Sequence, residues 1–513
     1  MNILFITADQ WRGDSLGYAG HPLVRTPHID AFAADATAFL NHYANAAPCS
    51  PARACLYTGL YQMTNRVVRN GTPHAHRFDN VALAARRLGY EPTQFGYSDQ
   101  SADPTVVPAG DPRLTTYEGV LPGFELRQRL TEDEKTWLSW LRGQGVVFAD
   151  RQAAHLPANG ATGITDAAPG YTADQTQTAF LAGEFIRWHG EQDRPWFAHL
   201  SFLRPHPPFI VPAPYNTLYD PAETGPFARA ADPASDAAVH PLVAFAHATT
   251  GLEHFVMGAE GRVADLSDAE FRQLKATYLG MISEVDAQLG RVFEALKAAG
   301  TWDDTLVIFT SDHAELMGDH YLLGKGGYHD QSQHVPLVIR DPRATRRGNR
   351  VTAFTEAVDI YPTIVEALGG TPAHVPDGVS LLPWLSGQPS TWRDEVHWEF
   401  DFREVALQTA EQAFGLSSTQ LNLATIRTDK WKYVHFAALP PLLFDLAADP
   451  ANLINLADDP AHAPVRLEMA ERLLRWRATH LDQTLALKEL TPQGVVKHQL
   501  PAPPPLVKPA LPG

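Results

Sequence analysis

The chain has 513 residues, a formal net charge of −17 and two cysteines. Its 58 acidic residues against 41 basic ones argue against nucleic acid or an anionic membrane as a partner, and two cysteines cannot form a disulfide framework. The first residues show no cleavable leader, and no apolar run reaches the ~20 residues of a membrane helix. We therefore expect a cytoplasmic protein that binds neither nucleic acid nor membrane.

Apolar runs alternate with helical patterns along the first 370 residues. The run NILFITAD, at 2–9, is apolar on both faces, which is typical of a strand in a sheet that is covered on both sides. Further strands are expected at 90–98, 195–203, 305–312 and 335–340, and helices at 26–39, 80–88, 174–191 and 270–300. This alternation predicts an α/β sandwich with a mostly parallel central sheet.

The pattern changes after about residue 370. Short, alternating, aromatic-rich segments such as HWEFDFREV and KWKYVHF predict a smaller antiparallel sheet, and 463–480 predicts a helix that closes it. The prolines of 490–513 favour an extended arm that forms neither helix nor sheet. We predict three parts: a large α/β domain at 1–370, an α+β subdomain at 371–483 and a proline-rich C-terminal arm at 484–513.

Two of the expected strands end in acidic residues. Asp9 is followed by Gln10, and Asp312 is followed by His313. Functional groups gather at the carboxyl ends of strands in open α/β sheets, and carboxylate, amide and imidazole groups together suit a divalent metal ion. A terminal aspartate can equally serve as a turn residue or a helix N-cap, so each pair alone leaves both interpretations open.

The segment 47–61 contains both cysteines and follows the pattern C-x-P-x-R-x-x-L-x-T-G from Cys49 to Gly59. This pattern resembles the signature of the sulfatases, in which the cysteine is oxidised after translation to formylglycine. Arg53 is the arginine of the pattern, whereas Cys55 occupies a free position, where we expect a small buried residue. A buried structural Cys49 and a cysteine thiolate activated by Arg53 are the alternatives.

The resemblance extends over most of the chain. It is carried by segments that include ADQWRGDSLG, LGYEPTQFGYS, RPHPPF, SDHAELMGDHYLLGKGGYHDQSQHVPLVIRDP and HWEFDFR. The sequence is most similar to the phosphonate monoester hydrolase and phosphodiesterase branch of the sulfatases, within the alkaline phosphatase superfamily, and to related arylsulfatases. The resemblance implies an alkaline-phosphatase-like sandwich with a smaller C-terminal domain.

Residue by residue, the resemblance implies a metal-binding set and a catalytic set. The expected metal ligands are Asp9, the formylglycine made from Cys49, Asp312 and His313. Gln10 would lie beside these ligands, and Arg53 would hold the formylglycine hydroxyl. His206 and Lys325 would stabilise the reacting group or protonate the leaving oxygen, although a loop ordered by prolines and a solvated lysine are simpler interpretations of these two.

Three further positions are expected to contact the substrate. Asn70 and Tyr97 match positions around the transferred group, although Asn70 could be a turn residue and Tyr97 a core residue. The related hydrolases have a small hydroxyl residue where this chain has Asp99. An acid at this position would repel a second negative charge on the substrate.

The resemblance implies a hydrolase of monoanionic esters that needs formylglycine and one divalent metal ion, with Mn²⁺ expected first and Zn²⁺ or Ca²⁺ as alternatives. Sulfate monoesters, phosphonate monoesters and phosphodiesters carry one negative charge, whereas a phosphate monoester is largely a dianion. Sulfate monoester hydrolysis, as in arylsulfatases, and phosphonate monoester or phosphodiester hydrolysis are close alternatives. An inactive binding protein with the sulfatase fold is a further alternative.

Two kinds of protein partner are expected besides the small anionic ester. One is a formylglycine-generating enzyme for maturation, and the other is a second copy of this chain, because the related hydrolases form dimers or tetramers. An arm with exposed apolar residues predicts a homodimer or homotetramer in which the arm crosses to the neighbouring subunit. These residues are Leu490, Val495, Val496, Leu500, Leu506, Val507 and Leu511. A disordered tail is the alternative.

Overall fold

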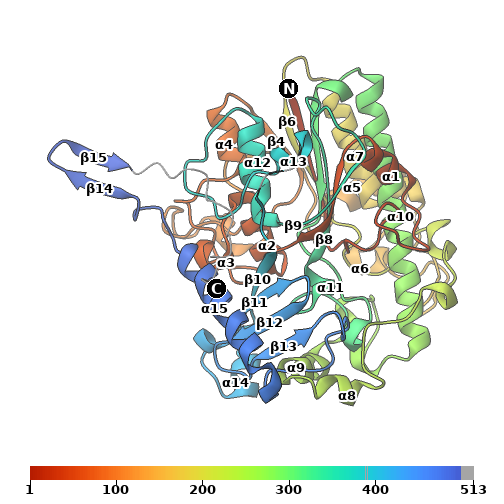
Figure 1. Ribbon diagram of the computed structural model, residues 1–513. Coiled ribbons are helices and arrows are strands. Elements are labelled where there is room, and N and C mark those ends of the chain that lie inside the picture. The colour runs from red at the N-terminus through yellow and green to blue at the C-terminus, as the bar shows by residue number, and fades with distance from the viewer. Residues whose placement is uncertain (388, 390, 498–513) are drawn as a thin grey trace.

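The computed structural model describes residues 1–387, 389 and 391–497, and its larger part is built on an eight-stranded sheet (Figure 1). The strand order is β5-β4-β6-β1-β7-β8-β2-β9. The strands are β1 Asn2–Ala8, β2 Thr37–Tyr43, β4 Pro92–Gly96, β5 Glu125–Arg129, β6 Phe197–Phe202, β7 Thr305–Thr310, β8 His334–Arg340 and β9 Asn349–Glu356. Neighbouring strands from β5 to β7 are parallel, and β8 runs antiparallel to both β7 and β2.

Helices cover both faces of this sheet, which explains why β1 is buried along its whole length. Leu4 and Ile6 pack into a core with α7 and α10, whereas Ile3 and Phe5 pack into a second core with α4 and α12. The main helices of this part are α1 Pro27–Ala34, α2 Cys49–Thr58, α4 Val81–Arg87, α5 Lys135–Gly143, α7 Gln177–His189, α9 Pro241–Thr249, α10 Asp268–Ala298, α12 Ile360–Ala367 and α13 Leu382–Ser386. Shorter ones are α3 Gln62–Asn65, α6 Arg151–Ala154, α8 Pro233–Ala237 and α11 Asp330–Gln333.

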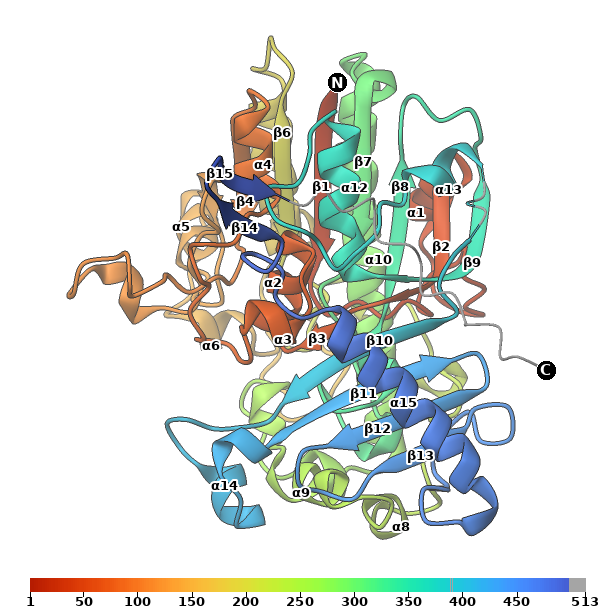
Figure 2. The ribbon, with the colours of Figure 1, turned by 60° about the vertical axis from the view of Figure 1, so that its left-hand side comes forward.

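A second, five-stranded sheet lies below the first in Figure 2 and has the order β13-β12-β11-β10-β3. Its strands are β3 Ala46–Ala47, β10 Glu395–Asp401, β11 Asn422–Thr428, β12 Trp431–Phe436 and β13 Leu442–Asp445, and α14 Thr409–Phe414 and α15 Ala463–Thr479 accompany it. All pairs from β10 to β13 are antiparallel, whereas β3 pairs parallel with β10. Because β3 directly precedes α2, the small sheet is joined to the segment that carries Cys49. The predicted fold class is confirmed, while the boundaries at residues 370 and 483 stay predictions.

The structure departs from the predicted elements at two places. The helix expected at 26–39 ends at Ala34, because the following Thr37 and Phe39 join the large sheet as part of β2. The arm, predicted to form no sheet, contains a hairpin of β14 Lys488–Thr491 and β15 Gly494–Lys497. Pro492 falls in the two-residue turn, where no backbone N–H is needed, and Gly494 has φ 110°. The apolar arm positions Leu500, Leu506, Val507 and Leu511 lie outside the described residues.

Among the helices of the described ranges, none is both long and apolar enough to cross a membrane.

Candidate active site

Most of the expected site residues follow four adjacent strands of the large sheet, β4, β6, β1 and β7, at their carboxyl ends. Pairing of β1 with β7 places Thr7 beside Thr310, so the residues that follow these strands meet at their carboxyl ends. There, one donor atom from each of four side chains lies within 4.8 Å of the other three, and all four side chains are buried. The four are Asp9, Cys49, Asp312 and His313. The expected ligand set is thus brought together, although its residues come from three separate segments.

The sulfur of Cys49 lies at the N-terminus of α2, where the helix macrodipole favours negative charge. It is 3.2 Å from His313 Nε2. Burial, and then the nearby carboxylate of Asp9, raise the pKa of the Cys49 thiol well above its ordinary value. The second cysteine, Cys55, is fully buried on the same helix and accepts a hydrogen bond from Asn65 Nδ2 at 3.4 Å, as suits a structural residue.

Arg53 follows Cys49 by one helical turn and therefore faces the same cluster. Its Nε donates to Asp312 Oδ2 at 2.8 Å, and its Nη2 lies 3.3 Å from Asp9 Oδ2. The guanidinium carbon stands 4.2 Å from the centre of the Tyr97 ring, and the Tyr97 hydroxyl donates to Asp9. Arg53 and Tyr97 thus hold the two carboxylates in place, and Asp9 Oδ1 still lacks a hydrogen-bond partner among the described residues.

Lys325 reaches the cluster through Gln10. Its Nζ donates to Gln10 Oε1 at 2.7 Å, and Gln10 Nε2 donates to Glu315. Burial disfavours the charged lysine, but Cys49 and Asp9 outweigh this effect and raise the pKa of Lys325. Glu315, which no predicted motif singled out, stands two residues after His313. It is fully buried and accepts hydrogen bonds from the backbone of the lysine loop, including Gly324 N at 2.5 Å.

His206 lies in the loop after β6 and is oriented by its own backbone. Its Nδ1 donates to the carbonyl oxygen of Pro207 at 2.8 Å, which leaves Nε2 free to exchange a proton. Burial, and then the charge of Lys325, lower the pKa of His206. Arg204 Nη1 donates to the carbonyl oxygens of His206 at 2.6 Å and Pro208 at 3.1 Å.

A buried charged network stands behind this loop. His155 Nε2 lies 2.6 Å from Glu134 Oε2 and 3.5 Å from Arg204 Nη2, and the His155 ring stacks on Trp137. Glu134 and His155 are fully or almost fully buried. No sequence motif pointed to these residues, because they are far apart in the chain.

Asn70 and the turn at Asp99 are both tied to the N-terminal end of α2, next to Cys49. Asn70 Oδ1 accepts the backbone N–H of Ser50 at 2.9 Å, so its carbonyl holds the first turn of α2. Gln100 Nε2 donates to both Asp99 O and Ser50 O, at 2.9 and 3.1 Å, and thereby ties the Asp99 turn to the same helix end. Asp99 has φ 50° and a buried side chain, as a turn aspartate can adopt.

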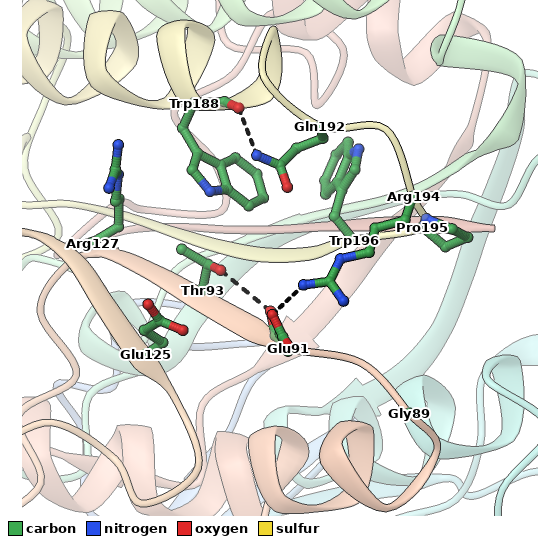
Figure 3. Close-up of a pocket in the computed structure, with 10 residues that line it drawn as sticks. All are labelled: Gly89, Glu91, Thr93, Glu125, Arg127, Trp188, Gln192, Arg194, Pro195 and Trp196. Carbon is green, nitrogen blue, oxygen red and sulfur yellow. Dashed lines mark hydrogen bonds and ion pairs between the residues drawn. The ribbon is translucent and has the colours of Figure 1, made fainter.

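A cavity of about 220 Å³ lies at the amino ends of strands in the large sheet (Figure 3). Thr93 at the start of β4 and Trp196 just before β6 line it, so it faces the amino ends of the strands. Two of its charged residues, Glu91 and Arg194, form an ion pair with each other. Because this cavity faces the amino ends of the strands, it lies apart from the Cys49 cluster at their carboxyl ends.

Comparisons with known proteins identify a family and several similar structures. The sulfatase family profile matches residues 1–370, and a profile described as N-sulphoglucosamine sulphohydrolase, C-terminal, matches residues 318–479. The chain is 41% identical to the multifunctional alkaline phosphatase superfamily protein PehA of Trinickia caryophylli, over 96% of this chain and 98% of that protein.

Two solved structures are also similar. The phosphonate monoester hydrolase of Agrobacterium radiobacter has 57% identity and a TM-score of 0.95, over 97% of this chain and all of that one. The phosphonate monoester hydrolase SpPMH of Silicibacter pomeroyi has 38% identity and a TM-score of 0.92, over 97% of this chain and 99% of that one.

Proposed function

The chain belongs to the sulfatase family and is a hydrolase, and on this premise we propose that it hydrolyses monoanionic esters with a formylglycine made from Cys49. Phosphonate monoesters are the first candidate class, because two similar structures covering nearly the whole chain are phosphonate monoester hydrolases. Sulfate monoesters are the second, because the family profile is that of the sulfatases. The observation that carries the proposal is the buried cluster of Cys49 with two carboxylates and an imidazole, beside Arg53.

The cluster fits one divalent metal ion. Two carboxylates and an imidazole are suitable ligands, and Asp9 Oδ1 is a buried acceptor without a partner among the described residues. We assign Asp9, Asp312, His313 and the modified Cys49 as the residues that would hold it, with Mn²⁺ as first choice and Zn²⁺ or Ca²⁺ as alternatives. When bound, such an ion supplies positive charge at the nucleophile and lowers the pKa of a hydroxyl that coordinates it.

Formylglycine explains why a cysteine, and not a serine, stands at the N-terminus of α2. Its hydrated aldehyde would supply one hydroxyl as the nucleophile. A second hydroxyl, which a serine lacks, would then lose its proton and release the transferred group. The raised pKa of the Cys49 thiol gives no support to a thiolate nucleophile. A formylglycine-generating enzyme is then needed for maturation. We infer that maturation happens in the cytoplasm, because both cysteines are free and disulfides are rare in that reducing compartment.

The remaining side chains act on charge and protons. Arg53 and Lys325 place cationic groups around the cluster, where they would offset negative charge that builds on the equatorial oxygens of the transferred group. His206 presents Nε2 with its ring fixed by Pro207, so it is the group we assign to protonate the leaving oxygen, with Lys325 as the alternative donor. Gln10 holds Lys325, and Tyr97 holds Asp9, so both act by positioning.

The charge balance supports a substrate with one negative charge. Arg53 is already paired with Asp312 and Asp9, so much of its positive charge is offset before a substrate binds. A dianionic phosphate monoester would meet more repulsion here than a monoanion does.

Side-by-side kinetics test the proposal. Three monoanionic substrates are 4-nitrophenyl phenylphosphonate, 4-nitrophenyl sulfate and the diester bis(4-nitrophenyl) phosphate. Their rates of hydrolysis are compared with that of 4-nitrophenyl phosphate, a monoester that is largely a dianion. We expect kcat/KM to be highest for the phosphonate and at least about tenfold lower for the dianionic phosphate monoester. No hydrolysis of any monoanion by fully modified, metal-loaded protein would overturn the proposal.

The arm supports a homo-oligomer of even order, a dimer or a tetramer. A two-stranded hairpin is marginally stable in water by itself, and the β14–β15 hairpin projects from the rest of the chain (Figure 1). Its Leu490, Val495 and Val496 side chains are 84%, 58% and 52% exposed. Apolar exposure of this kind is removed if the hairpin packs on a neighbouring subunit.

A further inference from the structure

The backbone of Gln10 is fixed in a conformation that few residues adopt. Gln10 is 1% exposed and has φ 69°, in the left-handed region. Its backbone N–H donates to Asp312 Oδ1 at 3.3 Å, and its carbonyl oxygen accepts from the Tyr278 hydroxyl at 2.8 Å. A residue other than glycine is strained in this region and keeps its conformation only where surrounding contacts fix it. The side chain of Gln10 therefore leaves the backbone at a defined place beside the metal-ligand cluster.

The side-chain amide of Gln10 lies between a cation and an anion. Lys325 Nζ donates to Gln10 Oε1 at 2.7 Å, and Gln10 Nε2 donates to Glu315 Oε2. An ammonium group can only donate hydrogen bonds, and an ionised carboxylate can only accept them. These two neighbours therefore permit one orientation of the amide, in which Oε1 faces Lys325. Without the carboxylate, nothing in this pair of contacts would keep Nε2 turned away from the lysine.

Glu315 also holds the backbone that carries Lys325. Its Oε1 accepts the backbone N–H of Gly324 at 2.5 Å and that of Met317 at 2.9 Å, whereas its Oε2 accepts from Gln10. One buried carboxylate is thus bonded both to the residue before Lys325 and to the side chain that receives its Nζ. Because Glu315 is not one of the four residues of the metal-ligand cluster, any effect it has on the reaction must pass through other groups.

We propose that Glu315 is a positioning residue for Lys325 and that it acts by setting the orientation of the Gln10 amide. The inference rests on the proposed function, in which Lys325 offsets negative charge on the transferred group. The alternative is a glutamate that only stabilises the fold, by accepting the backbone N–H groups of Gly324 and Met317. The two roles differ in what happens when the carboxylate becomes an amide.

Glu315→Gln tests the proposal with the smallest change in shape. The new Oε1 can still accept both backbone N–H groups, but the new Nε2 faces Gln10 Nε2, so two donors meet. The Gln10 amide must then turn and present Nε2 to the Lys325 ammonium. We expect kcat/KM for 4-nitrophenyl phenylphosphonate to fall about 10²-fold, because the lysine is displaced from its place. Metal content and the circular dichroism spectrum should stay unchanged.

Glu395→Gln is the matched control. Glu395 is 5% exposed and pairs with Arg472 of α15, in the part of the molecule built on the small sheet. The same loss of a buried carboxylate there should leave kcat/KM unchanged.

A double-mutant cycle with Lys325→Met separates positioning from a general effect on the fold. If Glu315 acts through Lys325, Glu315→Gln should lower kcat/KM by less than about threefold once the lysine has been replaced. A purely structural role predicts the same loss in both backgrounds, because the two changes would then be independent. Binding of inorganic sulfate, measured by calorimetry, repeats the comparison without turnover. Its affinity should weaken several-fold on Glu315→Gln and no further in the Lys325→Met background.

Exchange of the two side chains, Gln10→Glu together with Glu315→Gln, supplies the rescue. The new amide would donate to the new carboxylate, whose other oxygen would accept from Lys325, so each donor again meets an acceptor. Gln10→Glu alone sets two carboxylates against each other and should be impaired. We expect the exchanged protein to recover kcat/KM to within about tenfold of the unaltered protein. Because the exchange keeps one carboxylate and one amide, it decides the question even if Glu315→Gln does not fold.

Equal losses from Glu315→Gln with and without Lys325 would overturn this inference. A folded, metal-loaded exchange variant that is no more active than Gln10→Glu alone would overturn it as well. Both results leave the proposed function intact, since the unaltered protein still hydrolyses the ester. If the unaltered protein, modified and metal-loaded, hydrolyses no monoanionic ester, the proposed function itself fails, and the sulfate-binding cycle then decides whether Glu315 positions Lys325.

Discussion

Arg204 donates a hydrogen bond from Nη1 to the carbonyl oxygen of His206 at 2.6 Å, and its Nη2 lies 3.5 Å from the ring of His155. The guanidinium therefore connects the His206 loop to the buried pair of His155 and Glu134. Because Arg204 contacts the backbone carbonyl oxygens of His206 and Pro208, Arg204 is a positioning residue. Its effect on the reaction should appear through the proton that His206 supplies.

The loss of kcat caused by Arg204→Met should be larger for esters whose leaving alcohol is more basic. We expect a loss of about 10²-fold for a phenyl ester, which needs protonation, and only a few-fold loss for a dinitrophenyl ester, which does not. Kinetics over a series of leaving groups measure this dependence. Arg340→Met removes an equally buried arginine far from the site and should leave the dependence unchanged. An Arg204 variant that loses the same factor on every ester would contradict the positioning role.

The metal-ligand assignment is tested by Asp312→Asn. Asp312 is fully buried and also accepts from Arg53, so its amide should weaken metal binding and turnover by at least about tenfold. Metal content after dialysis and activity are both measured, with exposed Asp303→Asn as the control. Chelation should inactivate the unaltered enzyme, and Mn²⁺ should restore it best. Full recovery with Ca²⁺ and none with Mn²⁺ would show that the choice of metal is wrong.

The buried carboxyl group of Glu284 predicts a pH dependence of stability. It is 2% exposed in α10 and accepts from Thr176 Oγ1 at 2.6 Å. Burial raises its pKa from 4.5 to about 7, so between these values the folded state keeps a proton that the unfolded chain has lost. Stability falls with rising pH wherever the folded state binds more protons, so this carboxyl costs up to about 3 kcal/mol once the pH has passed 7.

Glu284→Gln should therefore raise the free energy of unfolding by about 3 kcal/mol at about pH 8 and change it little at about pH 4.5. Denaturant unfolding at both pH values measures the difference. The exposed Glu253→Gln serves as the control. An equal effect of Glu284→Gln at both pH values would show that its ionisation is not the cause.

Removal of residues 488–513 tests the arm. If the hairpin packs on a neighbouring subunit, the truncated protein should have a smaller mass by light scattering and an altered KM or kcat. The matched control keeps the hairpin and replaces exposed Leu474 of α15 by serine, which should leave the mass unchanged. An unchanged oligomer mass with unchanged kinetics would mean that the arm is only a tail.

The residues whose positions could be predicted are those at which chemistry and local pattern coincide. Asp9 and Asp312 were expected to lie together at the carboxyl ends of the strands, because both end buried strands. The signature from Cys49 to Gly59 added the third segment of the cluster. The network of Glu134, His155 and Arg204 was missed, because its contacts join distant segments and leave no periodic pattern. The antiparallel direction of β8 was equally hidden, since a buried strand has the same composition in either direction.

The hairpin in the arm shows a different limit. The proline count of 490–513 was averaged over the whole segment, whereas pairing depends on where each proline lies. Pro492 falls in the turn and leaves the ladders of β14 and β15 intact.

The central claim is that the nucleophile is a formylglycine at position 49. The most direct measurement is the mass of the tryptic peptide 26–53, taken together with the turnover of the same preparation on 4-nitrophenyl phenylphosphonate. The account predicts a peptide with the aldehyde or its hydrate in place of the thiol, and turnover proportional to the aldehyde fraction across preparations. Full turnover by protein whose Cys49 is entirely an unmodified thiol would contradict it.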